Sequence, residues 1–141
     1  MRYNGDLQPL IDWVHKEYST EATARRRHDE PPFMDFVRET LPASQYHFWA
    51  GYNTAQTPCS GIWLHGFPHV HHWDKGTITM ICYLTECEGG NIAIGQDKEM
   101  EGATEQSPEP GKCVFVQADE WHGVKKIEAG ERLTVIVTAF K

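Results

Sequence analysis

The sequence predicts a mainly β domain, a sandwich or barrel of many short strands with helices packed outside it. From Tyr46 onward, aromatic and β-branched residues dominate and are interrupted by glycine and proline turn signals. The preceding segment carries helical periodicity instead. Many short strands after N-terminal helices favour an all-β core with a helical buttress. We expect one domain over residues 1–141, with 1–44 as the buttress and 45–141 as the core.

Composition and charge limit the possible classes of protein. The chain has 141 residues, is 40% hydrophobic and carries a net charge of −7, which allows a real core and disfavours nucleic acid as a partner. It contains neither an apolar run of about 18 residues nor the apolar centre of a signal peptide, so we expect a cytoplasmic protein without membrane contact. The sequence has no zinc-type Cys-x-x-Cys pair, and sparse cysteines in a chain without a signal peptide predict reduced thiols at Cys59, Cys82, Cys87 and Cys113.

Hydrophobic periodicity and turn residues place the individual elements. Apolar residues at three- and four-residue steps predict an amphipathic helix over residues 7–27, and a second helix is expected at Phe33–Thr40, before Pro42. Residues 96–110 form a polar, acidic loop that is the candidate for disorder. A turn at Glu128-Ala129-Gly130 is expected to join the last two strands. The predicted strands are Tyr46–Tyr52, Gly61–His65, Thr77–Leu84, Asn91–Ile94, Lys112–Val116, Val124–Ile127 and Arg132–Phe140.

A basic run, Arg25-Arg26-Arg27-His28, stands near the end of the first predicted helix. The favoured interpretation is a solvated helix terminus, where cations complement the C-terminal dipole. The alternative is a surface that grips a phosphate or an acidic partner. Asp29-Glu30-Pro31-Pro32 follows and ends any helix.

The motif His72-Trp73-Asp74, together with His122, has the composition of a metal site. Side chains at positions i and i+2 of an extended segment point the same way, so His72 and Asp74 can converge on one ion. His122 must then approach from a different strand. Two imidazoles and one carboxylate can occupy one face of an iron(II) octahedron and leave three positions open, as in non-haem iron oxygenases.

A second reading of the histidine-rich segment combines His69 and His71 with His122, as in a cupin metal site. It leaves Asp74 unexplained and lacks the downstream glutamate expected there, so we rank it lower. His15, His28 and His47 are expected to be ordinary surface or core residues, whereas the roles of His65, His69 and His71 stay open.

The motifs of residues 60–140 resemble, in order and spacing, the iron(II)- and 2-oxoglutarate-dependent dioxygenases, specifically the prolyl 4-hydroxylase-like branch. That family follows His-x-Asp with a Tyr-Leu-Asn strand, in which Thr85 replaces the asparagine here. The segments that carry the resemblance are Tyr83-Leu84-Thr85, Glu88-Gly89-Gly90-Asn91, Pro108-Glu109-Pro110-Gly111-Lys112, Val114-Phe115-Val116, His122-Gly123-Val124 and Gly130-Glu131-Arg132-Leu133-Thr134.

The resemblance implies a double-stranded β-helix, or jelly-roll, core and a set of site residues. It implies that His72, Asp74 and His122 bind Fe(II). It implies that Arg132 and Tyr83 hold the distal carboxylate of 2-oxoglutarate. Thr134 shares a strand face with Arg132 and is expected to add a hydrogen bond. Along this strand, Leu133, Val135 and Val137 should face one side, while Arg132, Thr134, Ile136 and Thr138 face the other.

Three functions follow as hypotheses. The first is an oxygenase that uses O2 and 2-oxoglutarate to hydroxylate a C–H bond with release of succinate. A proline-containing peptide is its first candidate substrate, while free amino acids, nucleobases and small metabolites stay open. The second is a cupin-like protein that binds iron, manganese or zinc without 2-oxoglutarate and acts as an isomerase or binder. The third is a catalytically inactive barrel that serves as an interaction module.

Overall fold

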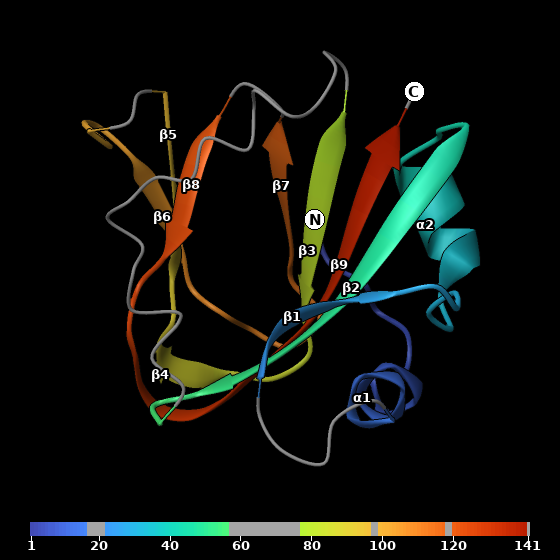
Figure 1. Ribbon diagram of the computed structural model, residues 1–141, viewed down its shortest axis with the longest axis horizontal. Helices are drawn as coiled ribbons and strands as arrows, with labels where there is room; N and C mark the ends of the chain where they lie inside the picture. The colour runs from blue at the N-terminus through green and yellow to red at the C-terminus, as the bar shows by residue number, and fades with distance from the viewer. Residues whose placement is uncertain (17–21, 57–76, 97–98, 118–119, 141) are drawn as a thin grey trace.

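Two antiparallel sheets and two helices make up the described part of the computed structural model (Figure 1). The structure describes residues 1–16, 22–56, 77–96, 99–117 and 120–140. The predicted strand Gly61–His65 lies outside them. The elements in these ranges are α1 (Gln8–His15), β1 (Ala22–Arg27), α2 (Met34–Thr40), β2 (Gln45–Thr54), β3 (Ile78–Tyr83), β4 (Cys87–Gly89), β5 (Ile92–Gly95), β6 (Thr104–Gln106), β7 (Cys113–Gln117), β8 (Trp121–Val124) and β9 (Ile127–Phe140).

The larger sheet has the order β1-β2-β9-β3-β7, with β4 paired to the first part of β9. The smaller sheet has the order β6-β5-β8. Every strand pair is antiparallel. Strand β9 is 14 residues long and lies at the centre of the larger sheet, between β2 and β3. The predicted all-β core with helices outside is therefore confirmed.

The two faces of β9 have different roles, as its alternating sequence predicts. Leu133, Val135 and Val137 are buried in the core between the larger sheet and the helices. On the other face, Ile136 packs into a smaller cluster with residues of β5. The register of the whole sheet follows from this alternation, because a slip of one residue would exchange the two faces.

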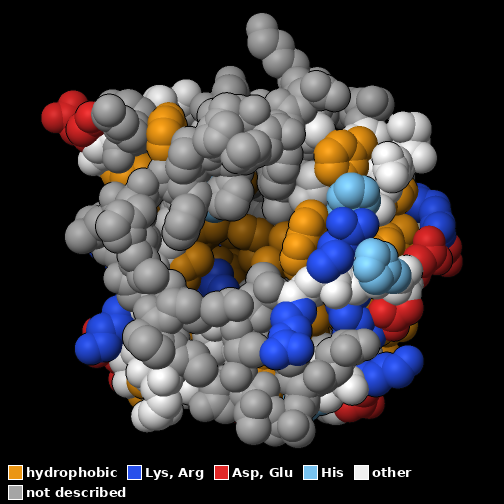
Figure 2. Space-filling view, viewed as in Figure 1, with side chains coloured by type: hydrophobic (Ala, Val, Ile, Leu, Met, Phe, Trp, Pro, Cys, Tyr) orange, Lys and Arg blue, Asp and Glu red, His pale blue; other side chains and the backbone are white. Residues whose placement is uncertain are grey.

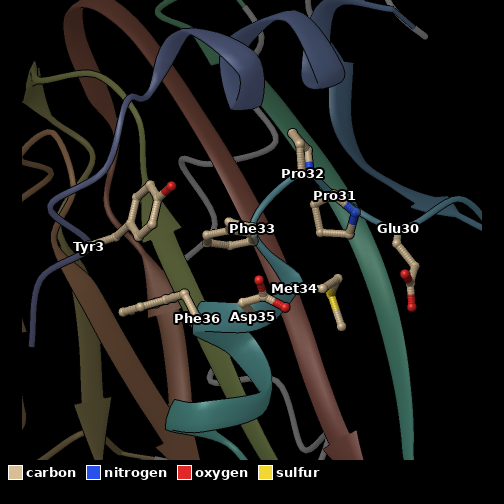
Figure 3. A pocket seen from close by; sticks show the side chains of 8 residues that line it. All are labelled: Tyr3, Glu30, Pro31, Pro32, Phe33, Met34, Asp35 and Phe36. Carbon is tan, nitrogen blue, oxygen red and sulfur yellow. The ribbon is translucent and has the colours of Figure 1, made fainter.

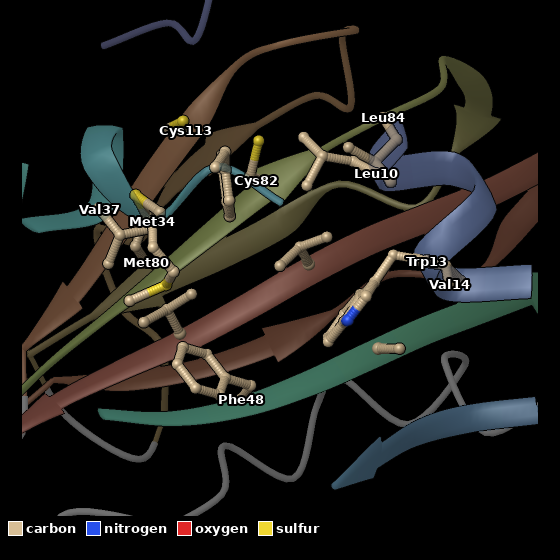
Figure 4. Close-up of a cluster of buried hydrophobic side chains, with 14 of the residues drawn as sticks. Leu10, Trp13, Val14, Met34, Val37, Phe48, Met80, Cys82, Leu84 and Cys113 are labelled. Atoms are coloured by element: carbon tan, nitrogen blue, oxygen red, sulfur yellow. The ribbon is translucent and has the colours of Figure 1, made fainter. Parts of the chain in front are cut away.

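The outer core holds the helices on the larger sheet (Figure 4). Helix α1 turns Leu10, Trp13 and Val14 inward, at the three- and four-residue steps of one helical face. Helix α2 contributes Met34 and Val37. Each fully buried aliphatic side chain stabilises the fold by about 1.5–3 kcal/mol relative to exposure. This layer therefore provides most of the apolar burial that holds the larger sheet in place.

The inner core lies between the two sheets and mixes apolar with polar groups. Its apolar members are Ile81, Tyr83, Ile92, Val114 and Val116. Buried threonines on the same faces bond to one another where they can, since the hydroxyls of Thr79 and Thr138 lie 3.0 Å apart across β3 and β9. The inner core is therefore partly polar, unlike the outer core.

The prediction of one helix over residues 7–27 is wrong in its second part. Helix α1 ends at His15, and Ala22–Arg27 forms β1, an antiparallel partner of β2. Alanine and arginine favour helix locally, but pairing along β2 overrides that weak preference. The segment 1–44 is therefore more than a helical buttress, because it supplies a strand of the larger sheet.

Two boundaries in the second half also differ from prediction. The expected turn at Glu128-Ala129-Gly130 is absent, and β9 runs without a break from Ile127 to Phe140. Gly130 has φ +89°, which only glycine adopts easily, and it lies opposite Cys87 in the β4 pairing. The predicted strand Val124–Ile127 is displaced, because β8 ends at Val124 and β9 begins at Ile127.

The acidic segment 96–110 is more ordered than predicted in its described residues. Strand β6, Thr104–Gln106, pairs with β5 and forms one edge of the smaller sheet. Strand β4 was not predicted, because three residues are too few for a periodic signal.

Cys82, Cys87 and Cys113 are free thiols. Neither helix in this part of the chain is long and apolar enough to span a bilayer.

Arg27 links β1 to α1 through buried contacts. The interpretation of the basic run as a solvated helix end is therefore wrong for this residue. Its side chain is 2% exposed and donates to both carboxylate oxygens of Asp29, at 2.9 and 2.7 Å. It also donates to the backbone carbonyl of Trp13 at 2.6 Å and lies 4.0 Å from the centre of that indole ring. The Trp13 ring N–H donates to Asp29 in turn. The guanidinium lowers the pKa of Asp29, so the carboxylate stays charged near neutral pH.

We predict that Arg27→Ala lowers the free energy of unfolding by about 1.5–3 kcal/mol, the range for hydrogen bonds to charged groups. Arg38 is a matched control, because it pairs with Glu30 at 2.9 Å while both side chains are exposed. Arg38→Ala should cost less than about 1 kcal/mol. Urea unfolding of the two variants measures the difference. Equal effects would contradict the structural role given to Arg27.

Candidate functional site

Polar residues of three strands meet on the inner face of the larger sheet. Thr134 on β9 lies opposite Tyr83 of β3 on one side and Gly51 of β2 on the other. Arg132, two residues earlier on β9, lies opposite Asn53 of β2. Because side chains at i and i+2 share a face, Arg132 and Thr134 point into the same space. Three of the predicted site residues, Arg132, Tyr83 and Thr134, are therefore brought together.

Arg132 is buried, with 5% of its surface exposed. Its Nε donates to the backbone carbonyl of Gly90 at 3.1 Å. Its Nη2 donates to the hydroxyl oxygen of Tyr83 at 3.4 Å, and the guanidinium carbon lies 5.2 Å from the centre of that ring. These contacts fix the guanidinium in place. They use only some of its five N–H donors, so the others can bind a further acceptor.

The charge of Arg132 is not neutralised by any carboxylate among the described residues. A buried charge is costly unless it is paired, and neutral oxygens compensate only part of that cost. The arrangement contrasts with Arg27, whose guanidinium is fully engaged by Asp29. An anion bound beside Arg132 would complete the pairing.

Tyr83 is fully buried beside Arg132. Burial raises the pKa of its phenol, and the neighbouring guanidinium only partly offsets this effect. The hydroxyl is therefore protonated at neutral pH and can donate to an anion. Arg132 and Tyr83 together form a donor pair of fixed geometry.

Thr134 adds a third donor to this space. Its side chain is fully buried, and its hydroxyl has no hydrogen-bond partner within the described part of the chain. Buried polar groups are nearly always satisfied, so a hydroxyl left over at this position indicates a missing acceptor.

Because Gly51 has no side chain, the Thr134 hydroxyl can occupy the space beside it. A Cβ atom at position 51 would lie 2.3 Å from the Thr134 Oγ1, far inside contact distance. The backbone of Gly51 needs no special φ, so its value lies in the absent side chain. Sequence reasoning did not single out Gly51, since a glycine within a strand gains this meaning only from its cross-strand neighbour.

His122 lies on the opposite, smaller sheet. It lies on β8 and pairs with Ile94, which packs against the inner core. It is half-buried, and its Nδ1 atom is shielded from solvent. The two remaining predicted metal ligands, His72 and Asp74, lie outside the described residues, as do His65, His69 and His71.

The surface is hollowed in front of the inner face of the larger sheet. Figure 2 shows this hollow with hydrophobic side chains on its floor and a Lys or Arg side chain at its base. The inner core therefore opens to one face of the molecule.

A second cleft, of about 480 Å³, lies on the helical side and has a different character (Figure 3). Its rings pack on one another, with centroids 5.0 Å apart for Tyr3 and Phe36 and 5.3 Å apart for Tyr3 and Phe33. Its charged residues are the acids Glu30 and Asp35. These rings continue the outer core, on the side of the larger sheet away from Arg132.

Comparison with known families supplies the decisive observation. The profile of the 2OG-Fe(II) oxygenase superfamily matches residues 62–138, more than half of the chain. The chain belongs to the 2OG-Fe(II) oxygenase superfamily. Members of this superfamily use Fe(II), 2-oxoglutarate and O2, and the resemblance predicted from the sequence is confirmed. A search of curated protein sequences gave no significant match.

Solved structures agree with this oxygenase fold. A prolyl 4-hydroxylase from Phytophthora capsici superposes with a TM-score of 0.62 at 17% identity, over 91% of this chain and 51% of that one. The viral collagen prolyl hydroxylase of Paramecium bursaria Chlorella virus-1 gives 0.60 at 14% identity, over 96% and 84%. The chain thus spans about half the length of the Phytophthora enzyme. The predicted double-stranded β-helix core, of prolyl 4-hydroxylase-like fold, is confirmed.

We predict that Gly51→Ala lowers the free energy of unfolding by about 1–3 kcal/mol, as overpacking of a core does. Adding Thr134→Ala should recover most of this loss, because the next Thr134 atom, its Cβ, lies 3.7 Å from the new methyl group. Adding Thr134→Val should not, since valine keeps an atom where the hydroxyl was. Urea unfolding of the single and double variants tests this. Equal rescue by alanine and valine would show that the contact is not steric.

Proposed function

We propose that this oxygenase is an Fe(II)- and 2-oxoglutarate-dependent dioxygenase that hydroxylates a substrate C–H bond. The observation that carries the proposal is the buried guanidinium of Arg132, which lacks a carboxylate among the described residues. A metal site alone does not need such a charge. A dicarboxylate cosubstrate does, because its distal carboxylate must be held away from the metal.

The donors around Arg132 suit one carboxylate. The guanidinium offers a planar fork that matches the two oxygens of a carboxylate. The protonated phenol of Tyr83 and the hydroxyl of Thr134 converge from β3 and β9. Gly51 keeps β2 from filling the space beside them. We assign these residues to the distal carboxylate of 2-oxoglutarate.

The donor set proposed for iron(II) is His72, Asp74 and His122. The last of these lies on β8 of the smaller sheet, opposite Ile94, which packs against the inner core between the two sheets. Two imidazoles and a carboxylate leave room for a bidentate cosubstrate and O2. The bound metal, with 2-oxoglutarate and O2, supplies the oxidising chemistry, and succinate and CO2 are the coproducts. The chain orients the cosubstrate and keeps its charge paired within the sandwich.

A proline-containing peptide is the first candidate substrate. Support comes from the order of motifs along the chain and from the fold shared with two prolyl hydroxylases. Free amino acids, nucleobases and other small metabolites are the alternatives. Release of succinate above background with each substrate pool ranks them, and stimulation by nucleosides but by no proline peptide would exclude the prolyl assignment.

We predict that Arg132→Ala raises the dissociation constant of 2-oxoglutarate by about tenfold or more. A charge-assisted hydrogen bond contributes about 1.5–3 kcal/mol, and each 1.4 kcal/mol is a factor of ten. Arg132→Lys should recover part of the loss, because it keeps the charge without the fork. Anaerobic calorimetry of the iron(II) protein measures both constants.

Iron affinity is the internal control, because Arg132 binds no metal in this account and its loss should leave that affinity nearly unchanged. Thr134→Val provides a variant of equal volume that removes one donor only, and it should weaken binding less than Arg132→Ala. An Arg132→Ala protein that binds 2-oxoglutarate as tightly as the parent would overturn the assignment.

A further inference from the structure

A basic and aromatic cluster lies on β1, the residue that follows it, and β2, on the face of the larger sheet that contains the site. We call Arg26, His28, His47 and Trp49 the Arg26 cluster. Arg26 lies opposite Trp49 in the β1–β2 pairing, with its guanidinium carbon 5.4 Å from the centre of the indole ring. The His47 ring lies 6.2 Å from the same indole. Figure 2 shows arginine or lysine and histidine side chains gathered beside the hollow.

The register connects this cluster to the candidate site. Trp49 is two residues from Gly51 along β2, and therefore shares its face. Two strand residues span about 7 Å, so Trp49 lies roughly that far from the glycine beside Thr134. Trp49 also lies opposite Ile136, the apolar residue of β9 on the inner face. A substrate that enters the hollow therefore passes within reach of the Arg26 cluster.

The cluster carries positive charge that the described residues do not neutralise. Arg26 and His28 are exposed, and Arg26 forms no ion pair with a described carboxylate. Arg27, the next residue, is by contrast fully engaged by Asp29. Burial, followed by the charges of Arg26 and His28, lowers the pKa of His47. In a chain of net charge −7, this local excess of positive charge favours the binding of an anion.

We propose that the Arg26 cluster binds a carboxylate of the substrate, and that the substrate is an acidic peptide. This inference rests on the proposed oxygenase function, and it names the substrate class for the same site. The guanidinium of Arg26 provides the planar fork that a side-chain carboxylate fits. Packing on Trp49 holds the fork in position, and so reduces the entropy lost on binding.

Two observations favour a peptide over a nucleotide or nucleic acid. The indole ring of Trp49 already carries Arg26 on its face and His47 at its edge, so it is not an open platform for a base. Strand β1 is at the edge of the larger sheet, and it pairs only with β2 among the described strands. An extended peptide can lie along such an edge and direct alternate side chains toward Arg26.

Arginines on an edge strand also protect a sheet against association with other sheets. That role needs charge of any kind and predicts no preference between acidic and neutral peptides. A comparison of isosteric peptides therefore separates the two roles.

The experiment measures the fluorescence anisotropy of two rhodamine-labelled peptides of equal length, one of repeated Glu-Pro and one of repeated Gln-Pro. The parent protein should bind the Glu-Pro peptide about tenfold more tightly, since the charge-assisted fork is lost with glutamine. Arg26→Gln should abolish the difference, and Arg26→Lys should restore part of it. Arg38→Gln removes another exposed arginine, from α2, and should leave the preference intact.

Equal binding of the two peptides, no measurable binding of the Glu-Pro peptide, or an unchanged preference in Arg26→Gln would each overturn the proposal. Tighter binding of a single-stranded oligonucleotide with the same number of negative charges would also overturn it, in favour of nucleic acid. The assay needs neither iron nor 2-oxoglutarate. Its failure is thus distinct from failure of the oxygenase assignment, which the affinity of Arg132→Ala for 2-oxoglutarate tests separately.

Discussion

The burial of one positive charge, that of Arg132, constrains much of the surrounding structure. The guanidinium lies between the ring of Tyr83 and the carbonyl of Gly90, which come from two different segments of the chain. Gly90 has φ +68°, and a Cβ there would press on the Arg132 Cδ at 3.2 Å. The turn after β4 therefore needs glycine for its conformation and for the space beside Arg132.

The two layers of the sandwich have different roles: the outer core stabilises the fold, and the inner core contains the candidate site. The outer core buries side chains of α1, α2 and the larger sheet, and it fixes the register of β9 through Leu133, Val135 and Val137. Because that register is fixed, residues that contribute less to stability can occupy the inner face. The hydroxyl of Thr134, which has no hydrogen-bond partner among the described residues, is one such group, and a bound carboxylate would supply its acceptor. The inner face accepts a polar site because the outer face already holds the sheet together.

Sequence reasoning succeeded where the signal was local. The alternation along Arg132–Phe140 assigned both faces of β9 correctly, since strand side chains repeat with a period of two. It also singled out Arg132, Tyr83 and Thr134 as candidate site residues; the structure places them on the neighbouring strands β9 and β3, and their binding role stays a prediction. It failed where long-range pairing decides the outcome. Ala22–Arg27 has helix-forming composition and becomes a strand only because β2 is its neighbour.

The role of Gly51 was hidden for a similar reason. Its importance depends on Thr134, 83 positions later in the sequence and directly opposite in the sheet. Arg27 was read as a solvated cation because its partner Trp13 is distant in sequence and joins it only through tertiary packing. The predicted metal ligands His72 and Asp74 lie outside the described residues, so their assignment stays a prediction from the motif.

The most direct test of the central claim is an anaerobic titration of the iron(II)-loaded protein with 2-oxoglutarate, followed by visible absorption. If 2-oxoglutarate binds the metal through its keto acid end while Arg132 holds the other end, a weak metal-to-ligand charge-transfer band should grow and saturate. Succinate, which has the distal carboxylate but no keto group, should produce no band and should compete with its formation. A protein that binds iron(II) but develops no band at saturating 2-oxoglutarate would contradict the account.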